Sequence, residues 1–186
     1  MKYSAFIPAI VISFLSVNAL ADTSTCKSIS GHINPLSPDP NCTIQQAKTA
    51  YFPDTTLVAE RIPQNIKQTC FSSTLTGTLT TSNNIQTAIQ GTAYSGLTAN
   101  EADYELTAVS AINLSAARNP LGWVFTKDVI INPYPVDPAN PDFTITKEIL
   151  SVIGGNNSLK NNKGHITILG SVFNPSGANF VGKFCY

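Results

Sequence analysis

Alternation of apolar and polar residues along the second half of the chain predicts a series of β-strands. In the clearest segment, residues 71–80, the odd positions read Phe, Ser, Leu, Gly and Leu, while every even position is Ser or Thr. A period of two places successive side chains on opposite faces of a strand. One face of this strand is therefore expected to be packed and the other to contact solvent.

The same pattern, interrupted by turn residues, predicts further strands. They span residues 85–97, 104–115, 123–132, 143–153, 165–173 and 179–186, and residues 28–33 are expected to supply an eighth strand. Asn, Gly and Pro clusters such as Asn83-Asn84 and Asn174-Pro175-Ser176-Gly177 separate the strands as turns. Short antiparallel strands at this spacing, without a convincing long helix, predict a sandwich or an up-and-down barrel.

The N-terminus has the pattern of a secretion signal. Lys2 precedes an apolar core from Phe6 to Val17, and Ala19-Leu20-Ala21 provides the small residues that a signal peptidase recognises. The apolar core is too short to span a bilayer. We therefore expect cleavage after Ala21, a secreted or periplasmic protein, and no membrane span.

Between this signal and the strands, the composition predicts an irregular arm. Residues 22–68 are rich in Pro and Asn, and a short helix is expected from Thr43 to Tyr51, with Thr43 as its cap. The expected organisation is a signal peptide at 1–21, a disulfide-stapled N-terminal arm at 22–68 and a β-barrel domain at 69–186.

The four cysteines are Cys26, Cys42, Cys70 and Cys185, and an even number in an oxidising compartment predicts two disulfides. We expect Cys26 to pair with Cys42 and close the first loop of the arm. We expect Cys70 to pair with Cys185, because these residues open the first main strand and nearly end the last. Strands that meet in this way close a sheet on itself, which favours the barrel over the sandwich.

A metal site is the weaker interpretation of the cysteines. Their spacings are wide, no CxxC occurs, and only His32 and His165 are available to assist. No metal and no cofactor are therefore expected.

The charge composition narrows the choice of partner. Charged residues make up 12% of the chain and the formal net charge is zero, so nothing suggests nucleic acid or an anionic membrane as a partner. The polar surface must come from Thr, Ser and Asn, a composition typical of exported β proteins. An apolar small molecule is the partner that an apolar inner face suggests, and the sequence does not predict an oligomeric state.

Two Lys-acid pairs flank the Pro-rich stretch at residues 132–142. The favoured interpretation is that Asp128 beside Lys127 and Glu148 beside Lys147 form cross-strand ion pairs on the outside of one hairpin. The alternative places Asp128 at the mouth of a cavity, where desolvation would raise its pKa and suit it to proton transfer or hydroxyl binding. The Pro-rich loop is read as an ordinary solvent-exposed connection, with a lid as the alternative.

Three residues form the expected ligand-binding set: Tyr104, Asp128 and Trp123. Tyr104 shares its strand face with Leu106 and Ile112, which favours an inward position, although packing is the commoner role of such a tyrosine. No catalytic set is predicted, since the sequence has no GxSxG elbow and no phosphate-binding loop.

Residues 70–186 resemble the allene oxide cyclase and dirigent-like barrels, especially their small secreted bacterial relatives. The resemblance rests on residues 73–79 (STLTGTL), residues 125–129 (FTKDV), Gly154-Gly155, Gly164, Gly170 and Phe184-Cys185. The sequence departs from the family at Asn156-Asn157, where a second small-residue pair is usual, and at Leu159, which stands near an aromatic position of the family. Asp128 lies in a segment that the relatives share.

The resemblance implies an all-β fold: a closed, antiparallel, eight-stranded β-barrel of the calycin-like, allene oxide cyclase and dirigent-like kind, with a central cavity. Members of the family include a cyclase of a fatty-acid epoxide and proteins that guide the radical coupling of phenols. The leading hypothesis is a secreted barrel that is non-catalytic or binds an apolar small molecule. The alternatives are a cyclase, isomerase or coupling guide, and a structural or host-interaction module.

Overall fold

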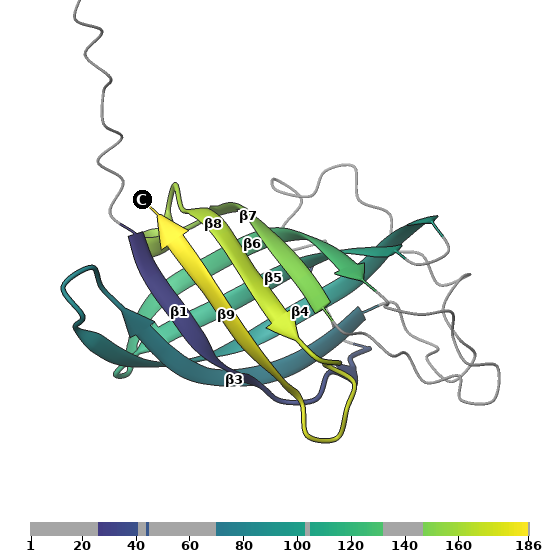
Figure 1. Ribbon diagram of the computed structural model, residues 1–186, viewed down its shortest axis with the longest axis horizontal. Helices are drawn as coiled ribbons and strands as arrows, with labels where there is room; N and C mark the ends of the chain where they lie inside the picture. Colours follow the sequence, from purple (N-terminus) through teal and green to yellow (C-terminus); the bar gives the residue numbers. More distant parts are fainter. Residues whose placement is uncertain (1–25, 41–43, 45–69, 103–104, 132–146, 186) are drawn as a thin grey trace, which may run out of the picture.

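The computed structural model describes residues 26–40, 44, 70–102, 105–131 and 147–185, and within them the chain forms a closed antiparallel β-barrel (Figure 1). The elements are β1 (Cys26–Ile33), β2 (Ser37–Pro38), β3 (Cys70–Thr80), β4 (Gln86–Ala102), β5 (Glu105–Ala116), β6 (Asn119–Ile131), β7 (Lys147–Gly155), the single-turn 3-10 helix η1 (Asn157–Leu159), β8 (Lys163–Leu169) and β9 (Ala178–Cys185). This arrangement confirms the predicted fold class.

The barrel closes through β1. From β3 to β9 each strand pairs with the next one in sequence, and β1 pairs with both β9 and β3. The eighth strand expected at residues 28–33 is thus confirmed, but the expected direct pairing of the first and last main strands is wrong because β1 lies between them. The short strand β2 pairs with β3 as an addition to the eight.

The alternating pattern of β3 is confirmed by its burial. Phe71 and Leu75 are buried inside the barrel, whereas Thr74 and Thr76 are exposed. The equivalent faces of the other strands complete one large apolar cluster, which includes Ile112, Leu150 and Phe180. The barrel interior is therefore a packed core rather than an open channel.

Two facing glycines allow β1 to approach β3 closely. Gly31 is paired with Gly77. A Cβ atom on Gly31 would lie 2.2 Å from the carbonyl oxygen of Thr76, and one on Gly77 would lie 2.3 Å from that of Ser30. Any side chain at either position would push the two backbones apart, so the strand pair that closes the barrel requires glycine here.

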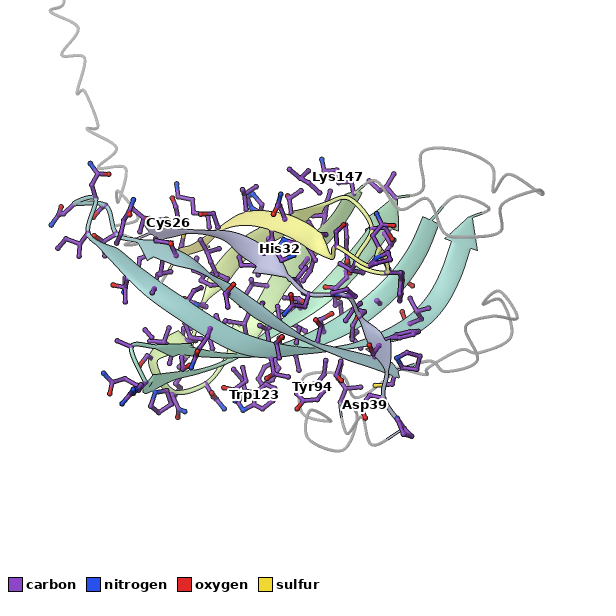
Figure 2. All side chains as sticks on the ribbon, turned by 90° about the horizontal axis from the view of Figure 1, so that it is seen from below. Cys26, His32, Asp39, Tyr94, Trp123 and Lys147 are labelled. Carbon is purple, nitrogen blue, oxygen red and sulfur yellow. A yellow bond between two sulfur atoms is a disulfide. The ribbon has the colours of Figure 1, made fainter. Side chains whose placement is uncertain are left out.

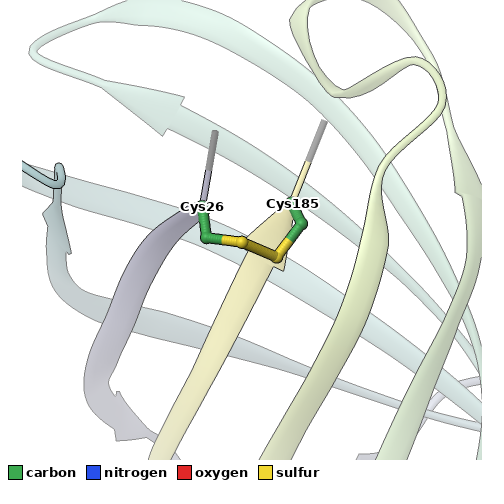
Figure 3. Close-up of a disulfide and its surroundings, with 2 residues drawn as sticks. All are labelled: Cys26 and Cys185. Atoms are coloured by element: carbon green, nitrogen blue, oxygen red, sulfur yellow. A yellow bond between two sulfur atoms is a disulfide. The ribbon is translucent and has the colours of Figure 1, made fainter. Parts of the chain in front are cut away.

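Cys26 and Cys185 are paired across β1 and β9 and form a disulfide (Figure 3). The predicted pairs Cys26–Cys42 and Cys70–Cys185 are therefore wrong. Strand β9 pairs with β1 rather than with β3, so Cys185 at the end of β9 lies opposite Cys26 at the start of β1. Cys70 is also disulfide-bonded. The two ends of the described chain are fixed together across a sequence separation of 159 residues, a closure that contributes about 4 to 5 kcal/mol in the chain-entropy treatment.

A second, smaller apolar cluster covers the outside of the barrel over β4, β5 and β6. It joins Cys70, Val109 and Phe125 to Ile44 from the N-terminal arm. Tyr94 and Trp123 pack against it with their ring centroids 6.0 Å apart (Figure 2). This part of the outer face is therefore covered by other side chains of the protein.

Several expectations fall on parts of the chain outside the described residues. They are the helix at Thr43–Tyr51 apart from Ile44, the position of Tyr104, and the Pro-rich loop at residues 132–142. Strand β8 ends at Leu169, earlier than expected, because Gly170 has a φ of +98° and begins the turn to β9. In the part of the chain that is described, no helix has the length and apolar character needed to cross a membrane.

Candidate functional site

Two carboxyl side chains point into the apolar interior of the barrel. Asp128 on β6 is 2% exposed and Glu148 on β7 is 4% exposed. The favoured interpretation, in which both formed ion pairs on the outer face, is wrong. The strand alternation places Lys127 and Lys147 outside, so the residue that follows each lysine must face inward.

The register of β6 and β7 makes the two carboxyls diagonal neighbours. Asp128 pairs with Leu150, and Glu148 pairs with Ile130. Diagonal positions on one sheet face bring Cβ atoms to within about 7–8 Å, a distance that two flexible acidic side chains can shorten. The sheet therefore places two acids side by side among aliphatic residues.

A short row of hydroxyl groups leads to Asp128. The Ser110 hydroxyl donates to Asp128 Oδ2 at 2.5 Å, and Ser110 Oγ lies 3.1 Å from Ser95 Oγ. A hydroxyl carries one proton, so Ser110 cannot donate to both neighbours at once. When Ser110 donates to Asp128, it is left to accept from Ser95, which gives a directed chain of hydrogen bonds from β4 through β5 to β6.

Burial keeps both carboxyls protonated at higher pH than usual. Desolvation raises the pKa of Asp128 from 3.8 to about 7, against the opposing effect of the nearby Ser110 and Thr126 hydroxyls. Desolvation also raises the pKa of Glu148 well above its ordinary value of 4.5, and the negative charge of Asp128 raises it further. As pH rises, Asp128 ionises before Glu148, because the negative charge of Asp128 opposes the ionisation of Glu148.

The site has more polar atoms than hydrogen bonds. Asp128 Oδ1 and Thr126 Oγ1 are buried and make no hydrogen bond, although the Thr126 hydroxyl is near enough to the carboxyl to affect its pKa. The Glu148 carboxyl borders the interior cavity and interacts electrostatically with Asp128. Unsatisfied buried polar groups are costly, about 1–3 kcal/mol each, so they call for a bound partner such as water or a ligand.

A cavity of about 30 Å³ lies beside Glu148 inside the barrel. Its polar lining is Ser95, Ser110 and Glu148, and the rest is apolar: Ile29, Ile33, Leu36, Leu75, Ala93, Ile112, Leu114, Leu150, Ile166, Ile168, Val172 and Phe180. One water needs roughly 10–15 Å³ of such space, so the cavity has room for about two waters. Drug-sized ligands occupy about 300–1,000 Å³, far more than this cavity holds in its present shape.

Side chains from two connections close the end of the barrel where β1 ends and β9 begins. Leu36 and Val172 line the cavity, and the Leu36 N–H donates to the Val172 carbonyl at 2.7 Å. Phe173 packs edge-on against Phe71, with ring centroids 5.2 Å apart. Leu36, Val172 and Phe173 belong to connections and form a plug, which packs against Phe71 of strand β3.

Of the three residues in the expected ligand-binding set, only Asp128 is found at the interior site. Asp128 faces the interior, Trp123 lies on the outer face against Tyr94, and Tyr104 is outside the described residues. Sequence reasoning missed the inward positions of Ser95 and Ser110. Ser110 did carry a signal, since it falls on the otherwise apolar face of its strand.

The chemical capacity of this site is proton donation and hydrogen bonding rather than metal binding. Across the described ranges, no three His, Cys, Asp or Glu side chains lie close enough together to hold a metal ion. A neutral Glu148 can donate a hydrogen bond into the cavity, and Asp128 can exchange a proton near pH 7. No family model matches this chain, and no curated protein matches it either.

Proposed function

We propose that the protein binds a small apolar molecule with one hydrogen-bond acceptor, such as a carbonyl or ether oxygen, inside its barrel. The observation that carries this proposal is the Glu148 carboxyl, which lines a mostly apolar cavity together with the hydroxyl groups of Ser95 and Ser110. A neutral carboxyl there donates to an acceptor on the ligand, while the aliphatic wall binds the remainder.

The energetic cost of the carboxyl supports a role in binding. A leucine at this position would bury a similar surface without the desolvation cost of a carboxyl, so the barrel would be more stable. Residues that reduce stability inside a core are enriched at functional sites. A bound oxygen atom would satisfy Glu148 and recover part of that cost.

The small volume of the cavity means that a ligand can enter only if side chains at the end of the barrel move. At about 30 Å³ it is too small for the proposed ligand unless the plug moves. The plug residues Leu36 and Val172 belong to connections rather than strands, and a backbone hydrogen bond joins them. Outward movement of these two side chains enlarges the cavity without breaking the barrel, as is common for ligand-gating loops.

A second candidate function is acid–base catalysis on the bound molecule, such as an isomerisation or cyclisation. It is favoured by Asp128, whose pKa of about 7 is suited to general acid or base catalysis at neutral pH. The Ser110 hydroxyl orients the carboxyl, and Glu148 supplies a neutral donor beside it. The resemblance to allene oxide cyclase and dirigent-like barrels agrees with this candidate at the level of the fold only.

We further propose that the protein works outside the cytoplasm, as a secreted or periplasmic protein. The Cys26–Cys185 disulfide supports this, because such bonds persist in oxidising compartments. A structural or host-interaction role, which requires no ligand, would leave the buried carboxyls without a purpose.

The binding proposal is tested with matched probes in which a carbonyl group replaces one methylene group. Cyclopentanone and cyclopentane have the same ring, and only the ketone accepts a hydrogen bond. Thermal shift and calorimetry should show tighter binding of the ketone to the wild-type protein. In Glu148→Leu the two probes should bind equally, whereas Lys147→Gln, the adjacent change on the outer face, should keep the preference.

Two results would count against the proposal. If neither probe binds and a high-resolution structure shows only ordered water against Glu148, the carboxyl is a hydrated core group. If the ketone preference survives in Glu148→Leu, the acceptor is recognised elsewhere. Catalysis is tested separately, since Asp128→Asn should abolish turnover of a bound substrate while leaving the ketone preference intact.

A further inference from the structure

The outer face of five adjacent strands, β6, β7, β8, β9 and β1, carries no acidic residue. Figure 1 shows β7, β8, β9 and β1 side by side on the near side of the barrel. The two acids within these strands are Asp128 and Glu148, and both point inward. We call this outer face the lysine face.

Three basic side chains and two serines form one row across the lysine face. The strand registers place Lys127, Ser151, His165, Lys183 and Ser28 in line, one from each strand. All five are exposed. Lys163 stands two residues before His165 on β8, and the exposed Lys147 lies toward the far end of β7.

Apolar side chains fill the space between these lysines. The row next to the basic one reads Val129, Ile149, Thr167, Val181 and Ser30. Val181 is 48% exposed, and Leu169, in the following row beside Lys147, is 51% exposed. Among the described residues, four large hydrophobic side chains are exposed, and three of them, Ile153, Leu169 and Val181, lie on these strands.

The overall charge balance of the chain conceals this face. The chain has 11 basic and 11 acidic residues and a formal net charge of zero. Asp128 and Glu148 are enclosed in the barrel and predominantly neutral below pH 7, so they do not offset the lysines outside. A balanced total therefore coexists with a positive outer face on these five strands.

From this arrangement we propose that the lysine face docks on the surface of an anionic lipid bilayer. Exposed aliphatic side chains rimmed by polar groups mark surfaces that bind a membrane or another protein. Lipid fits this face because Val181 and Leu169 can enter the acyl boundary while lysine stems extend their ammonium groups to the phosphates. Figure 2 shows Lys147 on the opposite side of the barrel from Tyr94 and Trp123, so docking leaves the outer aromatic cluster unobstructed.

Flotation with vesicles tests this proposal on the mature protein. The protein should bind mixed phosphatidylglycerol and phosphatidylcholine vesicles, bind pure phosphatidylcholine vesicles much less, and dissociate at about 1 M salt, where screening acts over only about 3 Å. Each lysine near an anionic surface strengthens binding roughly fivefold. Lys163→Gln with Lys183→Gln should therefore weaken binding by an order of magnitude or more.

Matched controls separate the face from general charge and hydrophobicity. Arg118→Gln removes an exposed cation in the turn between β5 and β6, and Ile85→Ser removes the exposed aliphatic residue between β3 and β4. These changes should leave binding unaltered, whereas Val181→Ser should reduce it. Circular dichroism melts of each variant establish that the barrel is folded.

Three outcomes would overturn the proposal. They are a failure to float with anionic vesicles, binding that does not depend on salt, and equal losses in the control variants. Retention on immobilised polyglutamate without vesicle binding would assign the face to an acidic protein partner instead and would also overturn it.

Discussion

Asp128 and Glu148 are diagonal neighbours on the inner face of β6 and β7, since Asp128 pairs with Leu150 and Glu148 with Ile130. Both are buried in the mostly apolar interior, and the negative charge of Asp128 raises the pKa of Glu148. Two neighbouring carboxylates in a low-dielectric interior cannot both ionise at ordinary pH. The pair therefore holds at least one proton at neutral pH, and this proton is available for hydrogen bonding or proton transfer inside the barrel.

The protein should lose stability as pH rises from about 4 to about 7. The folded-state pKa of Asp128 is raised from 3.8 to about 7 and that of Glu148 is raised well above 4.5. In this window the folded state binds more protons than the unfolded state, so the free energy of unfolding falls as pH rises. Urea unfolding midpoints at several pH values measure the effect.

The double variant Asp128→Asn, Glu148→Gln isolates the contribution of the pair. It lacks both titrating groups, so its stability should change less between pH 4 and pH 7 than that of the wild type. Parallel curves for the two proteins would mean that the carboxyls titrate normally in the fold.

Glu148→Leu should stabilise the barrel at pH 7. The change removes a buried, desolvated carboxyl and fills the cavity edge with aliphatic atoms. We expect an increase of about 1–3 kcal/mol in the free energy of unfolding. Ser151→Leu on the exposed face of the same strand is the control and should have little effect, and a destabilised Glu148→Leu would show that the carboxyl has a structural partner.

Removal of the Cys26–Cys185 disulfide should destabilise the protein by about 2–5 kcal/mol. The bond joins residues that are directly paired across β1 and β9, at a sequence separation of 159. Cys26→Ser with Cys185→Ser, compared by urea unfolding with the wild type, measures the loss. Peptide mapping without reductant should recover the Cys26 and Cys185 peptides linked, and a Cys26–Cys42 link would contradict the observed closure.

Gly31→Ala should loosen the pairing of β1 with β3. The new Cβ would lie 2.2 Å from the Thr76 carbonyl oxygen and 2.6 Å from Gly77 Cα, so the strands must separate. Such overpacking costs about 1–3 kcal/mol. Hydrogen exchange should increase most in β1 and β3. Ser30→Ala, an exposed change next in sequence, should leave the exchange rates unaltered, and equal rates in both variants would mean that the seam accommodates a methyl group.

Val172→Ala should widen the ligand space while lowering stability by roughly 2 kcal/mol. Val172 is 2% exposed and lines the cavity within the plug. The affinity for cyclopentanone should rise in this variant. Val124→Ala truncates an equally buried residue that does not line the cavity, so it should lower stability without a gain in affinity; the same gain in both variants would argue against entry at the plug.

Much of the fold was accessible from the sequence because its signals are local. Alternation in residues 71–80 and Asn and Gly turns predict strands from neighbouring residues alone, and the hairpin order then follows. The way in which the barrel closes could not be predicted from local signals. Whether Cys185 meets Cys26 or Cys70 depends on whether residues 26–33 enter the sheet between β9 and β3, which the cysteine spacings do not encode.

The candidate site was harder to predict for a different reason. Asp128 and Glu148 each follow a lysine, and adjacent opposite charges in a strand resemble a solvated surface pair. The outcome depends on strand phase, because a shift of one residue exchanges the inner and outer faces. Val124 and Ile130 share the phase of Asp128 and indicate its inward position, whereas the diagonal contact with Glu148 required the register of two strands.

Site-specific titration of the two carboxyls by carbon-13 NMR tests the central claim most directly. Side-chain carboxyl shifts recorded from pH 3 to pH 9, assigned with Asp128→Asn and Glu148→Gln, report the protonation of each group. The structure predicts that Asp128 titrates near pH 7 and that Glu148 titrates well above 4.5, after its neighbour has ionised. Titration of both carboxyls near pH 4 would contradict a protonated pair inside the barrel.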